Sequence, residues 1–570
     1  MGSTFTRRQF VMGAMVLGGS LALTGCSPKP ESKKQDGASG ATEPVQADII
    51  VIGSGLAGSA CSISAAQNGA SVLLVDKAPF LTSTFLTSKG NVSIAQVPEN
   101  KDEWCFESET PDTMDQFVSR YRNLTEIGKV DAPYPDYSRM QRMMEESCAT
   151  IAWVEQLGIT FEKSFTKEMV GTDTVKPDVS ADPATEAGVQ VANAFAAEFE
   201  RLGVRTMLSA EAKELIMDGD AVVGVKVEGP DGVQELRAKA VVLATGGFGG
   251  SAEYCDQLVP AINEMGFQYL GNAMNTGDGM TMASAIGAAL YEDPWVIPNV
   301  IMPTRTLTKA DAGFKKLCDT GMEGAATSSK MLVDSTGARF VNEAAPVTAL
   351  ATSMTDNQAG PYYVLFDSSN AEVVAVIEKG LSTGDVLKGV SIEELADAAG
   401  APQLAATFEA YQQAAAAGAD EAFGKKADML AAYGDGPFYL VKFVPSYVAT
   451  MGGVKTDASC QALGENGSVI PGLFAVGEAT HRFMYNRSFV RHCSNSSALT
   501  MGRLTGGAGH GVTTRSSLAR RPDPLPGLRL RLPAVKHASK IPALSSHRTI
   551  EIRTRLSRHR ARRMLALRCF

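Results

Sequence analysis

Three glycines near the start of the chain have the spacing of a loop that binds a pyrophosphate. They belong to the sequence GSGLAG at residues 53–58. In such a loop Gly53 makes the tight turn, Gly55 lets backbone N–H groups approach the phosphates, and Gly58 lets a helix pack closely on a strand. Asp76 follows at about 20 residues, the distance at which a carboxylate binds the hydroxyl groups of an adenosine ribose. Together these residues predict a dinucleotide site.

Two strands and a helix must hold this loop in place. Residues 48–52 and 71–75 are short apolar runs of strand type, and residues 59–68 between them have helical composition. A helix N-terminus near Leu56 adds partial positive charge beside the phosphates. A glycine motif alone is a weak signal. A strand, loop, helix and second strand that end in an acid are typical of a Rossmann-type fold.

Further motifs follow along the chain in a fixed order. A β-hairpin is predicted from residue 221, with its turn at residues 230–232. The other motifs are TGGFG at 245–249, TGDGM at 276–280, RFVNE at 339–343, VLFD at 364–367, TMGG at 450–453, PGLFAVGEA at 471–479 and SSALTMGRLTG at 496–506. This ordered set, from about Ala47 to Gly506, resembles the FAD-binding 2 superfamily. That superfamily includes fumarate reductase flavoprotein subunits, flavocytochrome c, urocanate reductase and ketosteroid dehydrogenases.

The resemblance implies an α/β fold with two domains. One is a Rossmann-type FAD-binding domain, a parallel sheet with a β-hairpin insertion, built from residues 47–290 and 447–506. The other is an inserted α+β capping domain at residues 291–446, which in relatives closes over the flavin. The implied cofactor is non-covalent FAD, and the implied activity is that of an FAD-dependent oxidoreductase acting on CH–CH bonds.

The resemblance also implies which residues bind FAD. Glu478 would lie at or near the ribityl chain, and a helix that starts near Ser496 would aim its N–H groups at the flavin N1/C2 carbonyl. The full set is Gly53, Gly55, Leu56, Ala57, Gly58, Asp76, Lys77, Ser83, Thr84, Ser88, Lys89, Gly90, Ala212, Ala244, Thr245, Gly246, Gly277, Asp278, Glu478, Ser496, Ser497, Ala498 and Leu499.

Two positions depart from the pattern of the dicarboxylate reductases in this family. Their proton-donating Arg aligns with Ala326, and their substrate-binding His, just before TMGG, aligns with the stretch that ends at Ala449. Alanine can neither transfer a proton nor hold a carboxylate. We therefore expect little activity on fumarate or succinate.

A cluster of polar residues between Glu478 and the flavin-facing helix supplies other candidates. It comprises His481, Arg482, Tyr485, Asn486, Arg487, Arg491, His492 and Cys493. Hydride transfer must be matched by a proton, so a Tyr, Arg or His above the flavin ring is needed. Our catalytic candidates are Tyr447 as proton donor, Arg487 and Arg491 as oxygen or carboxylate binders, and His492. The alternative for each is a side chain that caps a loop or faces solvent.

Three functions fit these motifs. The first is a reductase of an activated C=C bond, for which an Arg-rich pocket would favour small acids. The second is a dehydrogenase of the ketosteroid type, which an apolar cap would favour. The third is an electron-transfer flavoprotein with no small substrate, which a flavin edge without a pocket would favour.

The N-terminus has the features of an export signal. Residues 6–10 form a twin-arginine motif, residues 11–23 are apolar, and residues 23–26 resemble a lipobox that ends at Cys26. We expect a lipidated, membrane-anchored, extracytoplasmic protein; an uncleaved anchor is the alternative. Residues 27–46 form a flexible linker in which Thr42 ends a motif resembling a covalent FMN attachment site, or else a plain spacer.

Composition narrows the remaining possibilities. The chain has 570 residues, 44% hydrophobic and 20% charged, which excludes a disordered or fibrous protein. Residues 1–506 carry a net charge of −22, which argues against nucleic acid as a partner. Nine Cys without a CxxC pair predict neither a metal site nor a c-type haem. Electrons must then come from a separate donor such as a cytochrome or flavoprotein, unless Thr42 carries FMN.

The last 64 residues differ from the rest. Residues 507–570 carry 13 Arg and 2 Lys against two acids, a net of +13. Two interpretations stand: a basic tail that binds an anionic surface, or a shifted reading frame without an evolved fold. In either case we expect disorder.

Overall fold

The computed structural model describes most of the catalytic body. The described residues are 45–81, 90–95, 113–126, 131–162, 173–182, 185–318, 327–345, 347–357, 359–490 and 492–518. Residues 1–44, which include the expected signal sequence and most of the expected linker, lie outside them, as does the segment 520–570, a separate unit. So do the expectations for Cys26, Thr42 and the disorder of residues beyond 518.

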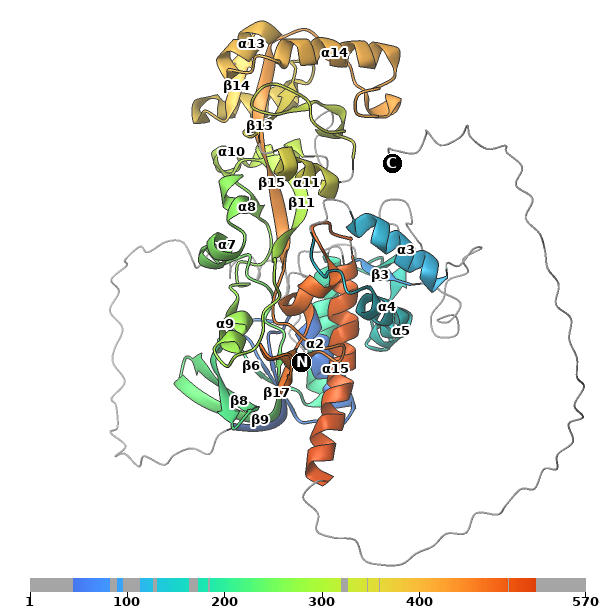
Figure 1. The fold of residues 1–570 in the computed structure, drawn as a ribbon, viewed down its shortest axis with the longest axis vertical. Coiled ribbons are helices and arrows are strands. Elements are labelled where there is room, and N and C mark those ends of the chain that lie inside the picture. Colours follow the sequence, from blue (N-terminus) through green and yellow to red (C-terminus); the bar gives the residue numbers. More distant parts are fainter. Residues whose placement is uncertain are drawn as a thin grey trace, which may run out of the picture. The chain divides into compact units, whose positions relative to one another are not determined.

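The domain that we expect to bind FAD is centred on an eight-stranded sheet (Figure 1), in which six strands follow the order β16-β17-β9-β1-β2-β6. β1 pairs in parallel with β2 on one side and β9 on the other. The central strand carries Ile49, Ile50 and Val51, which are buried on alternating faces because the sheet is covered on both sides. The strand bounds are β1 Val45–Ile52, β2 Val72–Val75, β6 Arg205–Met207, β9 Gly232–Leu243, β16 Gln461–Leu463 and β17 Val469–Ala475.

An antiparallel insertion extends this sheet. β7 (Glu211–Asp218) pairs with β8 (Ala221–Gly229), and β8 pairs with β9. The β8–β9 hairpin closes where Gly229 faces Gly232, which confirms the hairpin predicted from the sequence.

Two helices from opposite ends of the chain pack against each other on one face of the sheet. They are α2 (Leu56–Gln67) and α15 (Cys493–Leu518), which lie side by side in Figure 1. A side chain at Gly502 would collide with the backbone oxygen of Ala57, and one at Gly506 with that of Cys61. The close approach therefore depends on glycine in α15.

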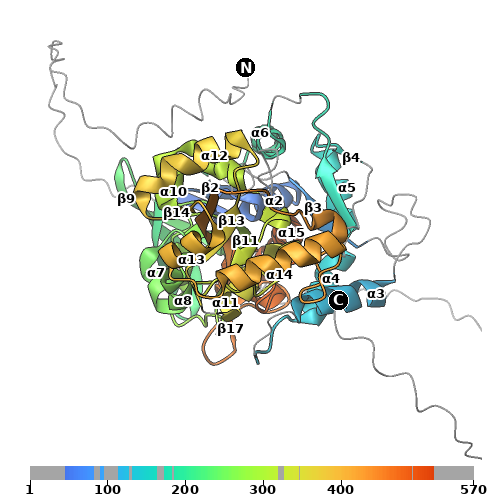
Figure 2. The ribbon, with the colours of Figure 1, turned by 90° about the horizontal axis from the view of Figure 1, so that it is seen from above.

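The second sheet forms the core of the capping region. Its order is β10-β15-β13-β12, with β11 and β14 also paired to β15. Figure 2 shows helices α10, α12, α13 and α14 around this sheet, and two apolar clusters fill the space between. The strand bounds are β10 Gln268–Tyr269, β11 Trp295–Pro303, β12 Leu332–Val333, β13 Tyr362–Phe366, β14 Val386–Gly389 and β15 Phe438–Met451.

The long strand β15 belongs to both parts of the chain. The expected domain boundary after residue 446 falls inside this strand, so the cap and the second FAD-binding stretch share one continuous strand. Its last residues, Thr450 and Met451, reach the site described below.

The remaining elements complete the catalytic body. A small sheet of β3 (Val92–Ile94), β4 (Phe161–Glu162) and β5 (Asp173–Pro177) accompanies helices α3 to α6. The helix bounds are α3 Met114–Thr125, α4 Tyr137–Glu145, α5 Ser147–Gln156, α6 Ala187–Leu202, α7 Ala252–Leu258, α8 Pro260–Glu264, α9 Asp278–Ser284, α10 Arg305–Ala310, α11 Val347–Asn357, α12 Ala371–Ile377, α13 Ile392–Ala399 and α14 Leu404–Ala417. Short 3₁₀ helices are η3 Ala312–Leu317, η4 Thr327–Ser329, η5 Glu378–Thr383, η6 Ala427–Met429 and η7 Gly477–Met484.

The C-terminal helix is longer than the sequence indicated. The change in composition at about Gly507 suggested that the folded part ends there, whereas α15 continues to Leu518. Within the residues that the structure describes, no helix is both long and apolar enough to pass through a membrane.

Candidate functional site

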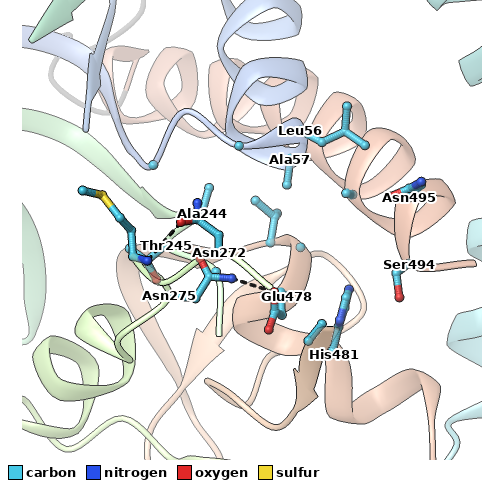
Figure 3. A pocket seen from close by; sticks show the side chains of 18 of the residues that line it. Leu56, Ala57, Ala244, Thr245, Asn272, Asn275, Glu478, His481, Ser494 and Asn495 are labelled. Carbon is cyan, nitrogen blue, oxygen red and sulfur yellow. Dashed lines mark hydrogen bonds between the residues drawn. The ribbon is translucent and has the colours of Figure 1, made fainter. Parts of the chain in front are cut away.

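One cavity of about 560 Å³ lies where the glycine loop, the end of β15 and the start of α15 meet (Figure 3). Its lining comes from segments far apart in the sequence, which the parallel sheet brings to one edge. This is the usual place for a ligand in an open α/β sheet, beyond the carboxyl ends of the strands.

The glycine loop forms one wall of the cavity. Gly53 has a φ of +102°, and a side chain there would collide with the backbone oxygen of Ala244. Gly55 lines the cavity, and a Cβ there would meet no protein atom within 4 Å. Helix α2 begins at the next residue, Leu56, which with Ala57 also lines the cavity. The loop therefore forms a cradle in which the position of a side chain at Gly55 would point into the open cavity.

Gly58 has a packing role instead. It does not line the cavity, and a side chain there would collide with the backbone oxygen of Gly53. This glycine lets α2 lie close to the loop, as the motif predicts, but the structure does not place it in contact with a ligand.

Acidic and basic side chains gather near the glycine loop. Asp76 accepts hydrogen bonds from Ser54 N and Oγ (both 2.6 Å) and from Ala78 N (2.9 Å). Lys77 forms an ion pair with Asp278 (2.6 Å). Asp76, Lys77 and Asp278 all line the cavity, as predicted, together with Ala212, Ala244, Thr245 and Gly246.

Glu478 lies at the centre of the site. Its carboxylate accepts hydrogen bonds from Thr450 N (2.8 Å), Thr450 Oγ1 (2.9 Å) and Asn275 Nδ2 (3.0 Å). Burial nevertheless raises the pKa of this carboxyl from 4.5 to about 7. A side chain at Gly247 would collide with both Glu478 and Thr450, so the neighbouring TGG motif is needed for this arrangement.

The flavin-facing helix starts earlier than expected. α15 begins at Cys493, and its cavity residues are Ser494, Asn495 and Ala498. Asn495 Nδ2 donates to the backbone oxygen of Asn91 (2.8 Å), which holds the first turn in place. Of the four residues predicted in this helix, Ala498 lines the cavity. Ser496, Ser497 and Leu499 are buried elsewhere, because a helix turns about 100° per residue and carries them to another face.

Tyr447 does not face this cavity, which corrects our leading prediction for a proton donor. It lies in a separate apolar cluster with Phe248 and Val296, and its hydroxyl donates to the backbone oxygen of Gly249 (3.2 Å). Burial raises the pKa of the phenol well above its usual value. The next residues along β15, Val448 and Ala449, line the cavity instead.

Of the two arginine candidates, the structure describes one, and that one does not lie at the cavity. The guanidinium of Arg487 stacks over the Trp295 ring, 4.1 Å from its centroid, and Arg487 does not line the cavity. Arg491 lies outside the described residues, as do Ser83, Thr84, Ser88, Lys89 and Ala326. Gly90 and Gly277 are described, with φ of +76° and +83°, but neither lines the cavity.

Two histidines line the cavity. His492 was predicted, and it has a φ of +65°, in the left-handed region that few residues other than glycine adopt. Its ring nitrogens lie 3.5 Å from Asn91 Nδ2 and 3.4 Å from Thr174 Oγ1. His481 was named in the polar cluster but not selected as catalytic.

His481 has an unusual environment for a histidine. It is 3% exposed, and neither ring nitrogen has a hydrogen-bond partner within the protein. Burial lowers the pKa of its imidazole from 6.5 to about 3, so the ring is neutral at physiological pH. No periodicity in the sequence distinguishes this residue from its neighbours in the cluster.

Several other lining residues could not be selected from the sequence. They are asparagines and apolar residues without a motif of their own: Asn91, Leu270, Asn272, Met274, Asn275, Ile297, Asn299, Val448 and Phe489. Of these, Asn275 directly precedes the TGDGM motif and Asn272 lies three residues earlier, which is a weak positional hint.

The residues present fit FAD. The cradle at Gly53 and Gly55, the helix N-terminus at Leu56 and the buried polar groups further along provide an anion site followed by hydrogen-bonding groups. The family model described as "FAD binding domain" matches residues 48–497. The chain belongs to the FAD-binding 2 family. As a member, it is an FAD-dependent oxidoreductase with a Rossmann-type FAD-binding domain and a capping domain.

Members of the FAD-binding 2 family with assigned functions resemble much of this chain. A probable fumarate reductase of Shewanella frigidimarina (strain NCIMB 400) is 28% identical over 459 residues, which cover 78% of this chain and 71% of the relative. A urocanate reductase of Eggerthella lenta is 27% identical over 473 residues, covering 80% of this chain and 74% of the relative.

A solved structure supports the fold. The 3-ketosteroid Δ1-dehydrogenase of Sterolibacterium denitrificans, in complex with 1,4-androstadiene-3,17-dione, superposes with a TM-score of 0.65 at 18% identity. The match covers 82% of this chain and 100% of the dehydrogenase.

The chain's own residues divide the work of this site. FAD supplies hydride transfer when bound. Gly53, Gly55 and the α2 N-terminus would hold its pyrophosphate, and Glu478 would accept hydrogen bonds from its ribityl region. The α15 N-terminus presents N–H groups at the far side, with Ser494 hydrogen-bonded to Tyr485 (3.0 Å). Val448, Phe489 and Ala498 add apolar surface that excludes water.

Proposed function

We propose that this flavoprotein reduces an activated C=C bond and is not specific for fumarate. The observation that carries the proposal is the contrast between the two ends of the cavity. Near the glycine loop it has Asp76, Lys77 and Asp278; near α15 it has uncharged polar groups, among them His481 and Asn495. Among the described residues that line the cavity, Lys77 is the one Lys or Arg, and it is already paired with Asp278.

This contrast bears on the substrate. A dicarboxylate held in a desolvated pocket needs cations close by, because an unpaired buried carboxylate is costly. The described lining offers no Lys or Arg at the α15 end, and Ala449 stands where the dicarboxylate reductases of the family carry a histidine. An acceptor with a single conjugated carbonyl suits this end better than fumarate does.

The relatives support the reaction class. By their names they include a fumarate reductase, a urocanate reductase, an NADH:acrylate oxidoreductase and a vinyl phenol reductase. These proteins share the reduction of a C=C bond and differ in what is attached to it. A 3-oxosteroid 1-dehydrogenase is also among them, so dehydrogenation is the alternative direction for this chain.

An anaerobic screen tests the proposal. The enzyme's flavin is reduced with a viologen dye, and reoxidation is followed spectroscopically against enoates, cinnamates, enones and fumarate. We expect rapid reoxidation by at least one conjugated acceptor and little by fumarate. Turnover of fumarate as fast as that of the best acceptor would contradict the proposal.

A second assay separates the alternatives. Oxidised enzyme is mixed with saturated 3-ketosteroids and an artificial electron acceptor. Dehydrogenation in this assay, without reoxidation in the first, would assign the ketosteroid-type direction. Failure of both assays, with rapid electron exchange to a partner cytochrome or flavoprotein, would assign an electron-transfer flavoprotein.

We also propose that the enzyme works outside the cytoplasm, anchored through Cys26, with non-covalent FAD and a separate electron donor. The twin-arginine motif, the apolar run and the lipobox-like sequence support this location. Membrane fractionation of the wild type and of Cys26→Ala tests it, since only the variant should become soluble. Acid precipitation should leave all flavin in the supernatant; flavin retained by the protein and lost in Thr42→Ala would show covalent FMN instead.

A further inference from the structure

His481 stands out because it is buried and yet unpartnered at the cavity. Both ring nitrogens lack a hydrogen-bond partner in the protein, although the residue is 3% exposed and lines the cavity. A buried polar group without a partner is costly, so native proteins usually satisfy it with protein, water or ligand. Figure 3 shows the ring directed into the cavity, where a ligand would meet it.

Its position assigns it to one end of the cavity. In Figure 3 the ring lies on the side of Ser494 and Asn495, whereas Thr245 and Asn275 lie on the other side of Glu478. His481 lies three residues after Glu478 in η7 and directly follows Thr480, whose backbone is not helical. The Tyr485 ring packs against the imidazole edge-on, with centroids 6.0 Å apart and planes at 90°. The ring therefore has a defined direction and no protein acceptor for its N–H.

The charge state of His481 restricts what it can bind. With its pKa lowered to about 3 by burial, the imidazole offers one N–H donor and one acceptor nitrogen but no positive charge. Among the Asp, Glu, Lys and Arg residues of the described lining, Glu478 is the nearest to His481 along the sequence. Its carboxylate, when ionised, would repel an anionic ligand. This end of the cavity suits a neutral hydrogen-bond acceptor.

We propose that His481 donates a hydrogen bond to the carbonyl oxygen of an uncharged conjugated substrate, such as an enone. This inference rests on the proposed C=C reductase function and adds the substrate class to it. The bond would hold the carbonyl, and with it the conjugated double bond, at the α15 end of the cavity. A substrate carboxylate of the same shape would be disfavoured, because the described lining has no Lys or Arg at this end to pair with it.

Two ligands of matched shape test the substrate class. Benzalacetone is an enone, and trans-cinnamate has the same skeleton with a carboxylate in place of the methyl ketone. Their binding to the oxidised holoenzyme is titrated at pH 7 through the change in flavin absorbance, which requires no turnover. We expect benzalacetone to bind roughly tenfold more tightly or better, as a 1.4 kcal/mol difference corresponds to tenfold. Equal or tighter binding of cinnamate would overturn the proposal.

Variants test the residue. His481→Phe keeps an aromatic ring without hydrogen bonds, and His481→Gln restores a donor and an acceptor. We expect His481→Phe to weaken benzalacetone binding roughly tenfold or more, given 1–3 kcal/mol for an unsatisfied partner, and His481→Gln to recover most of it. Flavin content and midpoint potential without ligand should not change.

A matched control removes another buried, unpartnered polar group. Thr500 is 1% exposed, its hydroxyl has no hydrogen-bond partner, and it does not line the cavity. Thr500→Val should leave the affinity for both ligands unchanged. If His481→Phe behaves like Thr500→Val, the proposal is wrong.

The remaining outcomes separate the sources of a carbonyl oxygen. A midpoint potential shifted in His481→Phe, with unchanged benzalacetone affinity, would assign the partner to a flavin carbonyl and overturn the substrate role. Tight benzalacetone binding, without flavin reoxidation by any acceptor of the panel, would contradict the proposed function while leaving His481 as a binding residue.

Discussion

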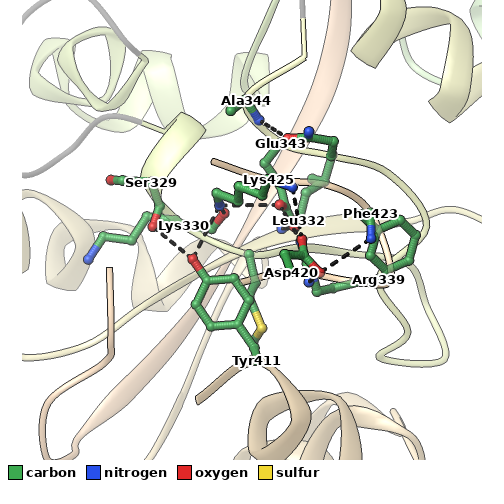
Figure 4. Close-up of polar contacts among 12 residues, drawn as sticks. Ser329, Lys330, Leu332, Arg339, Glu343, Ala344, Tyr411, Asp420, Phe423 and Lys425 are labelled. Carbon is green, nitrogen blue, oxygen red and sulfur yellow. Dashed lines mark hydrogen bonds and ion pairs between the residues drawn. The ribbon is translucent and has the colours of Figure 1, made fainter. Parts of the chain in front are cut away.

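Two buried polar regions of this molecule follow opposite rules. In the cap, Arg339, Glu343, Asp420 and Lys425 form a closed network with Tyr411 (Figure 4). At the cavity, burial raises the pKa of the Glu478 carboxyl, and neither ring nitrogen of His481 has a hydrogen-bond partner in the protein.

The cap network satisfies its charges internally. Arg339 Nε and Nη2 each donate to Glu343 at 2.8 Å, and Arg339 Nη2 also reaches Asp420 at 2.9 Å. Lys425 Nζ, whose side chain is fully buried, donates to Glu343 (3.2 Å), to Tyr411 (3.2 Å) and to the backbone oxygen of Lys330 (3.0 Å). Two cations balance two anions, so the network can fix the loop after α14 against the sheet.

The comparison teaches how to separate architecture from function. Where buried charges are paired and every donor is used, removing one partner damages the fold. Where a buried polar group is left without a protein partner beside a cavity, the missing contact is available to water or a ligand. The same criterion distinguishes Arg339, which comes from the family motif at 339–343, from His481, which comes from no motif.

The largest expected effect comes from breaking the cap network. Arg339→Met leaves Glu343 and Asp420 buried without their shared cation, and we expect a loss of about 3–5 kcal/mol in the free energy of unfolding. Urea denaturation measures it. Lys379→Met, which breaks the exposed pair with Asp311, should cost less than about 1 kcal/mol. A loss in Arg339→Met no larger than in this control would remove the distinction between the regions.

The raised pKa of Glu478 at the cavity should make the free energy of unfolding depend on pH. Glu478 has a folded pKa of about 7 against 4.5 for its ordinary value, so the folded state binds more protons between these limits. The free energy of unfolding therefore falls as pH rises through that range, by at most roughly 3 kcal/mol from this group. Thermal denaturation of flavin-free Glu478→Gln should lack that fall.

His481 should produce the opposite slope. Its folded pKa of about 3 lies below its ordinary 6.5, so the unfolded state binds more protons in between, and stability is lost as pH falls through this range. His481→Gln should therefore resist acid better than the wild type. If both variants keep the wild-type pH profile between about pH 4 and 7, neither group is buried in the way described.

The glycine loop separates ligand binding from folding. Gly55→Val adds a side chain where no protein atom lies within 4 Å, so the fold should survive while FAD binds at least roughly tenfold more weakly. Gly58→Val, which collides with the loop backbone, should lose both FAD and stability. Visible absorbance and circular dichroism measure the two properties. Normal flavin content in Gly55→Val would show that the phosphates lie elsewhere.

The smallest effect should come from Tyr447. Tyr447→Phe removes the buried hydrogen bond to the backbone oxygen of Gly249, which contributes about 1 kcal/mol to stability, and the longer contact with Cys255 Sγ (3.5 Å). Because the side chain does not line the cavity, the reoxidation rate with the best acceptor should change less than about twofold. A hundredfold loss of rate would restore Tyr447 as the proton donor.

Much of the fold could be predicted from the sequence because its motifs are local. The glycine loop, its flanking strands, the hairpin and the central Glu478 each occupy a few consecutive residues with strong backbone or charge requirements. These requirements are set by the ligand and by close packing, so they leave a pattern that can be recognised without knowledge of distant contacts.

The side-chain directions at the far end of the cavity could not be predicted. β15 is buried along nearly its whole length, so no alternation of apolar and polar residues shows whether Tyr447 or Val448 faces the cavity. The Ser- and Asn-rich stretch at 494–497 gives no unique start for α15, and a shift of three residues changes which side chains line the site. His481 gains its significance only from tertiary burial.

The packing of α15 on α2 has a consequence for how the enzyme is made. Ser64 in α2 donates to the backbone oxygen of Arg503 in α15 (2.7 Å), a residue that is translated 439 positions later. Both helix N-termini border the same cavity, one at Leu56 and the other at Ser494. During synthesis, α2 is made early, and nearly the whole catalytic body must be translated before α15 can pack against it and complete the cavity. FAD therefore binds late in folding, after α15 has been synthesised, and free FAD must be present when α15 packs against α2.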